Sequence, residues 1–362
     1  MSNIPAIVPT GAIRYNTDSN KMECFNGTQW MQVSVSSPDL GGNGGPAGNP
    51  TGNSADQVSG ARGLIMGGSS YTDTIEYITI PTTGNGIDFG NLDTGTMITS
   101  GCSSNTRGLC MGGRKSPGVQ ENRIEYVTIQ STGDGTDFGD LLKPNDYGSI
   151  GNLGNATRGM VQGGHNPAVP SFSAMGVDMN YVTIASTGHA VKFGECRTTH
   201  LYTAATFSSP TRGVIAGGGN PGGKLAEFIT ISTTGNASDF GNCSIAHQGG
   251  AGASSSVVGL VGGGYGGVHP GSIDHYSVQK FIIATTGNSI PWGDLTDSRR
   301  WICPLSDSIR AVWCGGYAPG SVDTMDYNMF ASSGNSVDFG NLTVSPASRG
   351  GQAGASSGHG GL

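Results

Sequence analysis

Residues 131–141 read STGDGTDFGDL and place three aspartates and three glycines within eleven residues. Carboxylates gathered in this way could bind Ca²⁺, which takes oxygen ligands. A glycine-rich turn could instead surround a phosphate with its backbone N–H groups. Either site needs a turn that is held by the elements on both sides of it, so the chemistry depends on which elements those are.

The same stretch recurs six times, and this changes its interpretation. The pattern is Thr or Ser, Gly, four residues, an aromatic residue and Gly, and it begins at residues 83, 132, 187, 234, 286 and 333. The residue before the aromatic is Asp in four copies, but Lys192 and Pro291 in the other two. Because a lysine has no lone pair to offer a cation, we expect a structural turn and no calcium site. The stretch also resembles the Asp box of sialidases, but Gly133 stands where that box requires Asp.

Two further motifs precede each copy. One is an arginine, an apolar run and two glycines, as in TRGLCMGG, and the other is an alternating stretch such as IEYVTI. Alternation rich in Val, Ile, Thr and aromatics predicts a strand. The arginine position holds Arg62, Arg107, Arg158, Arg212 and Arg310, with Val258 in the fifth repeat. We expect these arginines to pair with carboxylates or carbonyls of the adjacent repeat; a ring of arginines that binds an anion in a channel is the alternative.

The repeat period of 47 to 55 residues, with about four short strands in each unit, is typical of a β-propeller blade. The sequence therefore predicts an all-β fold, with a six-bladed β-propeller over residues 54–362. Only a short segment follows the last aromatic, Phe339, and we expect it to supply one strand, around 343–357, that completes blade one and removes an exposed edge. The double glycine followed by an aromatic resembles kelch repeats.

Composition excludes several classes of protein. The chain of 362 residues has 64 glycines, 12% charged residues and a net charge of −7, without a Lys/Arg cluster, so we expect no nucleic-acid binding. No apolar run is long enough to span a membrane, and the first residues do not resemble a signal peptide. The seven cysteines, none in a CxxC pair, are expected to be buried thiols. We expect no cofactor, no metal and no enzyme motif, although a metal pair of His269 and His275 is an alternative.

Function is expected in the segments whose length varies between repeats. These follow the double glycine at 69–74, 114–123, 165–178, 219–224, 264–274 and 317–323, and equivalent loops emerge on one face of a propeller. The candidate binding residues are Tyr71, Lys115, Arg123, His165, Phe172, Tyr265, His269, His275 and Tyr317.

Residues 11–33 predict a small β-meander that is too short to be stable alone. Its pattern, GAIRYNTDSNKMECFNGTQW, resembles a motif near the ends of tailed-bacteriophage fibre and virion structural proteins, and the repeats resemble those of phage structural proteins. The resemblance implies an N-terminal attachment region over 1–35, a Gly/Pro/Asn-rich linker over 36–53 and a location in the virion after assembly in the host cytoplasm. The expected virion-anchoring residues are Arg14, Tyr15, Phe25 and Trp30.

The leading hypothesis is a tail fibre or a tail or baseplate appendage whose propeller binds a host-surface glycan or protein or another virion protein. By analogy with tail fibres, the resemblance allows a homotrimer. A capsid decoration is the nearest alternative. A propeller glycosidase or depolymerase would need paired acids, for which Asp73, Glu121, Asp178, Asp274 and Asp323 are available without a recognisable pairing. A cellular kelch-like scaffold is the third class of hypothesis.

Overall fold

The computed structural model describes residues 9, 12–16, 21–32, 61–164, 176–197, 203–219, 223–266 and 273–362. The chain divides into two compact units, Met1–Val58 and Ser59–Leu362. The smaller unit contains a three-stranded antiparallel sheet of β1 (Ile13–Asn16), β2 (Lys21–Phe25) and β3 (Trp30–Gln32), in that order. The predicted linker, 36–53, lies outside the described residues.

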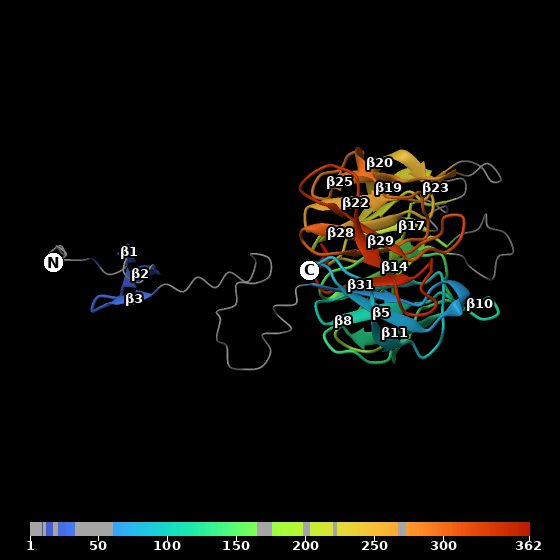
Figure 1. Cartoon of the computed structure of the whole chain (residues 1–362), viewed down its shortest axis with the longest axis horizontal. Helices are drawn as coiled ribbons and strands as arrows, with labels where there is room; N and C mark the ends of the chain where they lie inside the picture. Colours follow the sequence, from blue (N-terminus) through green and yellow to red (C-terminus); the bar gives the residue numbers. More distant parts are fainter. Residues whose placement is uncertain are drawn as a thin grey trace. The chain divides into compact units, whose positions relative to one another are not determined.

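The described residues of the larger unit contain six sheets of three to five strands, which we number in the order of the repeats, and two short two-stranded pairs (Figure 1). The arginine motif forms the second strand of each sheet: β4 (Arg62–Met66), β8 (Arg107–Met111), β14 (Arg158–Gln162), β18 (Arg212–Ala216), β22 (Val258–Gly262) and β28 (Arg310–Cys314). The alternating motif forms the third strand: β5 (Thr74–Thr79), β11 (Arg123–Thr128), β15 (Asp178–Thr183), β19 (Gly223–Thr230), β25 (Ser277–Ile282) and β29 (Thr324–Met329). The aromatic-glycine motif forms the fourth: β6 (Ile87–Asn91), β12 (Thr136–Asp140), β16 (Val191–Glu195), β20 (Ser238–His247), β26 (Ile290–Asp294) and β30 (Val337–Asn341).

The first strands are short, and most of their side chains are small. The first strands are β31 (Ala353–Ser356) in sheet 1, β7 (Ser100–Ser103), β17 (Ala204–Ser208), β21 (Ala251–Ser254) and β27 (Cys303–Ser306). Since β31 pairs antiparallel with β4, the last strand of the chain completes the sheet of the first repeat, which is the pairing that the sequence predicts (Figure 1). Short accessory pairs, β9 (Arg114–Lys115) with β10 (Val119–Gln120) and β23 (Tyr265–Gly266) with β24 (Ile273–Asp274), and a 3₁₀ turn, η1 (Ser69–Tyr71), lie in the variable segments.

Sheet 3 departs from the predicted four antiparallel strands. Its β14, β15 and β16 form a three-stranded sheet, while β13 (Ser149–Ile150) pairs in parallel with β17 of sheet 4. Gly151, at φ 134°, explains the departure, because a Cβ atom there would lie 2.0 Å from the Thr206 carbonyl oxygen. Because Gly151 has no side chain, the backbone at β13 can pair with β17 of sheet 4 and does not pair with β14 of sheet 3.

The core is divided among the interfaces between sheets. Leu64 and Phe89 of sheet 1 pack with Ile129 of sheet 2 in one buried cluster, and four similar clusters join the sheets that follow. A sixth cluster packs Ile65 of sheet 1 against Leu305 of sheet 6. The interfaces thus form a closed series, which is a propeller-like all-β arrangement.

The repeated stretch that contains residues 131–141 is a joint between sheets. The Gly133 N–H donates to the Phe89 carbonyl of the preceding sheet at 2.9 Å. All the other repeats make the equivalent bond, and the bond from Gly84 to the Phe339 carbonyl, at 2.8 Å, closes the series. Gly139, at φ 141°, must lack a side chain, because a Cβ atom there would lie 2.5 Å from the Gly188 carbonyl oxygen.

The repeated arginines also join neighbouring sheets. Arg62, Arg107, Arg158 and Arg212 each donate from Nη1 to the carbonyl of an isoleucine in the next sheet, over 2.7–2.9 Å, as the sequence predicts. Each of these guanidinium groups also stacks on the aromatic ring of its own third strand, 4.4–4.7 Å from the centroid. These hydrogen bonds and stacking contacts engage the arginines between sheets, which argues against the alternative of an anion-binding ring.

The cysteines follow the prediction of buried thiols. Six of the seven are buried and free, and Cys24 is half-buried. Burial raises the pKa of the Cys102 thiol to about 12, and that of Cys110 to about 12. Among the described residues, no helix is long and apolar enough to cross a membrane.

Candidate functional site

The segments that lead into the first strands meet in a closed ring of backbone hydrogen bonds. In each sheet one residue donates its N–H to the carbonyl of the equivalent residue in the preceding sheet, over 2.7–3.3 Å, and the sixth bond returns to the first residue. We call these residues the axial ring: Ile98, Tyr147, Thr203, Gly249, Trp301 and Gly351. Since every member bonds to two others, the ring fixes the six segments against one another.

All six ring residues adopt a positive φ. Gly249 and Gly351 do so at 68° and 74°, where glycine meets little steric resistance. The other four, among them Tyr147 at 56° and Trp301 at 53°, place a side chain in the left-handed region. Each such residue costs about 1–2 kcal/mol relative to an ordinary conformation. Bulky side chains at positions where glycine is also accepted point to a function for those side chains.

Aromatic rings gather around one side of the axial ring. The centroids of Tyr147 and Trp301 lie 6.4 Å apart, and those of Trp301 and Tyr317 lie 5.8 Å apart, with tilts of 56° and 57°. Burial raises the pKa of Tyr147, and the nearby Tyr71 contributes to that shift. All of these rings are half-buried, so part of each is open to a ligand. Together with Tyr265 we call them the axial aromatic cluster.

Two arginines hold the cluster. The Arg300 guanidinium lies 4.9 Å from the Tyr265 and Trp301 centroids and 4.6 Å from that of Tyr317. Arg114 lies 4.9 Å from the Tyr147 centroid. Each arginine has an acidic partner: Arg300 binds Asp274 at 2.5 Å, and Arg114 binds Asp146.

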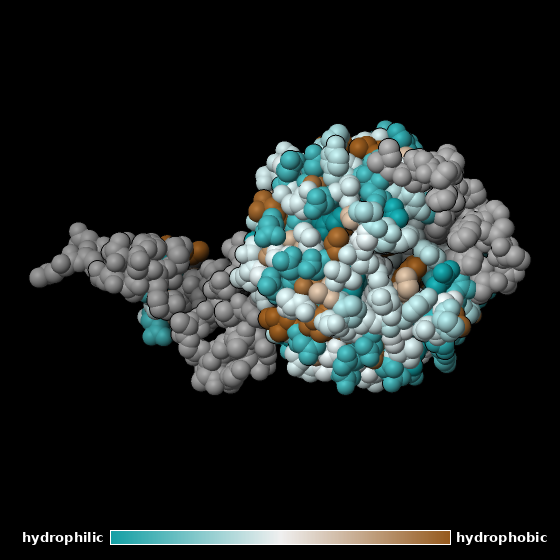
Figure 2. All heavy atoms as spheres, turned by 45° about the vertical axis from the view of Figure 1, so that its right-hand side comes forward, coloured by the Kyte–Doolittle hydropathy of each residue, from teal (hydrophilic) through white to brown (hydrophobic). Residues whose placement is uncertain are grey.

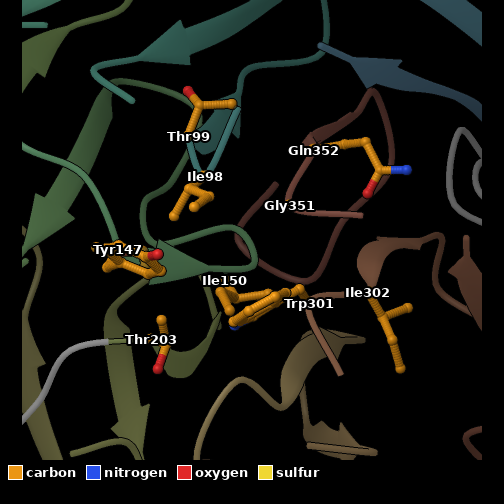
Figure 3. Close-up of a pocket in the computed structure, with 11 residues that line it drawn as sticks. Ile98, Thr99, Tyr147, Ile150, Thr203, Trp301, Ile302, Gly351 and Gln352 are labelled. Carbon is orange, nitrogen blue, oxygen red and sulfur yellow. The ribbon is translucent and has the colours of Figure 1, made fainter. Parts of the chain in front are cut away.

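A small pocket opens at this place, and Figure 3 shows its lining side chains around a common space. We call it the axial pocket; Tyr147, Ile150, Thr203, Trp301 and Gln352 contribute to it. Two of its buried polar atoms, Trp301 Nε1 and Gln352 Oε1, have no hydrogen-bond partner among the described residues. One is a donor and the other an acceptor, and both atoms are buried.

The structure brings three of the predicted binding residues to this cluster and separates the rest. Tyr71, Tyr265 and Tyr317 belong to it, as described above. Lys115 forms an ion pair with Glu121 at 2.5 Å, and Arg123 forms pairs with Asp93 and Glu125. His275 is half-buried near His247, and its pKa is lowered by burial. His165, Phe172 and His269 lie outside the described residues.

Sequence reasoning missed Tyr147, Trp301, Arg114 and Arg300. Tyr147 and Trp301 stand in segments of nearly constant length, which we had not associated with binding. A signal was present in the spacing, since the ring residue stands nine residues before the arginine position in four repeats and eleven before it in the third. A tryptophan and a tyrosine at a position that also accepts glycine mark a place where side chains are not needed for folding.

Three of the five acids near the loops, Glu121, Asp178 and Asp274, pair with basic side chains. Asp178 binds Lys143 and Lys192, both at 3.1 Å. Partial burial acts to raise the pKa of Asp178, but the hydrogen bonds from the two lysines outweigh it and the pKa is lowered. In the described parts of the chain, no group of three or more His, Cys, Asp and Glu side chains is placed to hold a metal ion.

Among the described residues, several large apolar side chains are exposed on the fourth strands. Ile87, Val191, Ile290 and Val337 are each just over half exposed, and each begins the fourth strand of a different sheet. On the face drawn in Figure 2, hydrophobic residues form separate spots among polar ones. Scattered apolar residues of this kind are normal on a protein surface.

Three of the expected virion-anchoring residues cluster on the small sheet. The rings of Phe25 and Trp30 lie 5.4 Å apart, and the Arg14 guanidinium lies 4.2 Å from the Trp30 centroid. Arg14 also binds Glu23 at 2.8 Å. The side chain of Tyr15 lies outside the described residues.

Comparisons with known proteins support the fold. No protein-family model and no curated protein matches this chain. The chain is similar to the solved structure of YjhT, a β-propeller, with a TM-score of 0.57 and 12% sequence identity. The similarity covers 70% of this chain and 87% of YjhT. At this identity the likeness bears on the fold alone, which is all-β and propeller-like.

Proposed function

We propose that this protein is a structural protein of a tailed-bacteriophage virion, a tail fibre or a tail or baseplate appendage, whose six-bladed β-propeller binds the host surface or another virion protein. The observation that carries the binding role is the axial aromatic cluster. Tyr265 and Tyr317 from two variable segments join Tyr147 and Trp301 there, since the Arg300 guanidinium lies against the rings of Tyr265, Trp301 and Tyr317, although these residues come from separate segments of the chain. The virion role rests on the N-terminal motif of the sequence.

Six blades are supported by three independent closed series. The buried clusters join sheet 6 back to sheet 1, the axial ring closes through Gly351, and the joints of the fourth strands close through Gly84. A repeat protein with open ends would leave an unpaired edge at each end, and a closed ring does not.

A binding role fits the electrostatics better than hydrolysis does. A glycosidase needs one free carboxylate and one protonated acid at a defined separation. Asp274 and Asp146 beside the cluster are each neutralised by an arginine, and Asp178 by two lysines. Incubation with host-surface polysaccharide is the matching assay, and release of reducing ends would establish hydrolysis in place of binding.

The small sheet suits the role of an attachment region. Its three short strands lie within residues 13–32, and a sheet of that size buries too little to be stable alone. Arg14, Phe25 and Trp30 form a surface of one cation and two aromatic rings, which is the composition of many interface anchors.

The test of the virion role is labelling of intact phage particles. Antibodies raised against residues 61–362 should mark the tail or its fibres in electron micrographs. Label confined to the capsid would replace the tail assignment with a capsid decoration, and absence of the protein from purified particles would refute the virion role. As a matched test of attachment, Trp30→Ala together with Phe25→Ala should remove the protein from particles, whereas Thr28→Ala on the same sheet should not.

A further inference from the structure

We propose that a cavity between sheets 2 and 3 binds a carboxylate-bearing sugar of a glycan, with the sugar carboxylate in the place where the other sheets have a buried side-chain oxygen. This inference rests on the proposed binding function and specifies a ligand and a site for it, separate from the axial aromatic cluster. We call this space the junction cavity. It has a volume of about 190 Å³ and is lined by Leu142, Lys143, Asp178, Asn180 and Lys192.

At the other five places where a fourth strand leads to the next sheet, a side chain of that next sheet caps the departing backbone. Glu76 Oε1, for example, accepts the N–H groups of Thr343 and Val344, four and five residues after Phe339, at 2.7 and 2.9 Å. Equivalent bonds of 2.8–3.0 Å are accepted by Glu125, Glu227, Gln279 and Asp326. All five acceptor residues are at most 5% exposed. The recurring oxygen satisfies backbone donors that the end of the strand leaves free.

Asn180 has this position in sheet 3, but it makes no such bond. Its Oδ1 atom is buried without a hydrogen-bond partner in the described part of the chain. The N–H groups of Leu142 and Lys143 correspond to those of Thr343 and Val344, and they too have no acceptor among the described residues. Leu142 and Lys143 are exposed and line the junction cavity, so a ligand can reach them. This place therefore lacks one acceptor and has open space beside the two donors.

The charge at the junction cavity is reversed as well. Four of the five acceptors are acids, and each pairs across the strands with an aspartate of the fourth strand: Glu76, Glu125, Glu227 and Asp326. In sheet 3 the same pair is Asn180 with Lys192, so an amide and an ammonium group replace two carboxylates. This exchange of charge favours an anionic ligand.

The two lysines at the cavity are held in place and still have donors to offer. Asp178 binds the ammonium groups of Lys143 and Lys192, both at 3.1 Å, and Lys192 also binds Glu195 at 2.7 Å. An ammonium group has three donors, so these contacts leave two on Lys143 and one on Lys192. A ligand carboxylate can thus accept from two backbone N–H groups and from ammonium groups that its acidic neighbours already position.

The size and lining of the cavity favour a sugar acid over a smaller anion. A cavity of about 150 Å³ can hold benzene, so the junction cavity has room for a six-membered ring. Its lining is polar except for Leu142. The hydroxyl groups of a sugar can donate to Asp178 and accept from the lysines, whereas the aliphatic stem of a glutamate in a protein partner can do neither.

The test is calorimetric titration of the full chain with oligosaccharides of glucuronic, galacturonic and sialic acid, each beside its methyl ester. At least one acid should bind, and its ester should not. Asn180→Glu gives sheet 3 the side chain that sheets 1, 2 and 4 have. It should weaken binding at least tenfold and raise the melting temperature, because its carboxylate takes the place of the ligand. Lys192→Ala, at an exposed position, should weaken binding at least threefold and decides the matter if Asn180→Glu does not fold. The control is Lys224→Ala, which removes another exposed lysine, bound to the Ser244 carbonyl, and should bind within twofold of wild type.

The outcomes separate this inference from the virion role. Binding of none of the acids, or equal affinity of wild type and Asn180→Glu, would overturn the site. Equal binding of acids and esters would overturn the role of the carboxylate, and tighter binding of a glutamate-rich peptide would overturn the sugar in favour of an acidic protein partner. Particle labelling is independent of these results, so a labelled tail without binding of any sugar acid would refute the site and leave the virion role.

Discussion

His359 is buried at the end of the larger unit where the first strands finish, and its removal should be costly. The residues that follow β31 run across this end and contact several sheets. His359 Nε2 donates to the Ser103 carbonyl at 2.9 Å, and the Gly360 N–H donates to the Ser254 carbonyl at 2.8 Å. The Gly361 N–H donates to His359 Nδ1 at 3.1 Å, so both ring nitrogens are used and the imidazole is neutral. His359 itself is 2% exposed.

His359→Ala would break two hydrogen bonds and leave a cavity. Each buried hydrogen bond contributes about 1 kcal/mol net, and the Ser103 carbonyl and the Gly361 N–H would lose their partner. Removing the ring adds the loss of its packing, about 1 kcal/mol or more. We expect the free energy of unfolding to fall by about 2–4 kcal/mol at pH 7.5.

The pH dependence gives a second signature of the same residue. Burial lowers the pKa of His359 to about 4, below the ordinary value of about 6.5. The unfolded chain therefore takes up a proton at a pH where the folded chain does not, and the stability from this residue is full above pH 6.5 and is lost as the pH falls toward 4. Between pH 6.5 and pH 4, protonation linked to His359 should lower the free energy of unfolding of the wild type by about 3 kcal/mol. His359→Ala should not show this part of the pH dependence.

Urea unfolding of the full chain, followed by tryptophan fluorescence at pH 7.5 and at pH 4.5, measures both effects. His189→Ala is the matched control, because that side chain is 75% exposed, and it should change stability by less than about 0.5 kcal/mol. A loss below 0.5 kcal/mol for His359→Ala, with an unchanged pH slope, would show that His359 is solvated.

Three further predictions concern the parts that join the sheets. Arg107→Ala should lower the free energy of unfolding in urea by about 1–2 kcal/mol, since it removes the hydrogen bond to the Ile184 carbonyl and the stacking on Tyr126. The control Arg197→Ala, in an exposed pair with Asp239, should lower it by less than about 0.5 kcal/mol. Equal effects would contradict the role of Arg107 in joining neighbouring sheets. Gly101→Ala should cost more than about 3 kcal/mol, because a Cβ atom there would lie 2.2 Å from the Gly354 carbonyl oxygen of β31, the first strand of the preceding sheet. Gly84→Ala, with open space around it, should be tolerated, and thermal melts of the two variants decide this. A thiol reagent at pH 8 should label at most Cys24 rapidly in the folded protein and all seven cysteines in denaturant, because burial raises the pKa of the six buried thiols; rapid labelling of two or more would contradict the packing.

Features that each repeat carries within itself were predictable from the sequence. The alternating stretch around Tyr126 and the aromatic at Phe138 predict the third and fourth strands, and their rings meet edge to face in the structure, 6.0 Å between centroids. The arginine at the same position of successive repeats predicted a hydrogen bond to the neighbouring sheet, because a cation that recurs at one position of the repeat needs an acceptor that recurs as well. The last strand was predictable by counting residues after Phe339.

Features that arise only between repeats were not predictable. The parallel pairing of β13 depends on Gly151 meeting two other sheets at once, and no local pattern encodes that meeting. The axial ring depends on positive φ values at Ile98 and Thr203, which are residues that ordinarily avoid them. The segment around Trp301 varies little in length between repeats, so a search for function in segments of variable length passes over it.

The axial ring explains how function can vary while the fold is kept. Its closure depends on N–H and carbonyl groups, which every residue type found there provides, and the six positions accordingly hold isoleucine, tyrosine, threonine, tryptophan and two glycines. The joints between fourth strands behave in the opposite way, because their aromatic rings fill the core between sheets and five of the six are phenylalanine. A position whose backbone carries the structure leaves its side chain free for recognition. Substitutions that change ligand specificity should therefore be made at the axial ring and at the loop tyrosines around it. At these positions side chains can be exchanged without losing the backbone contacts that close the series of sheets.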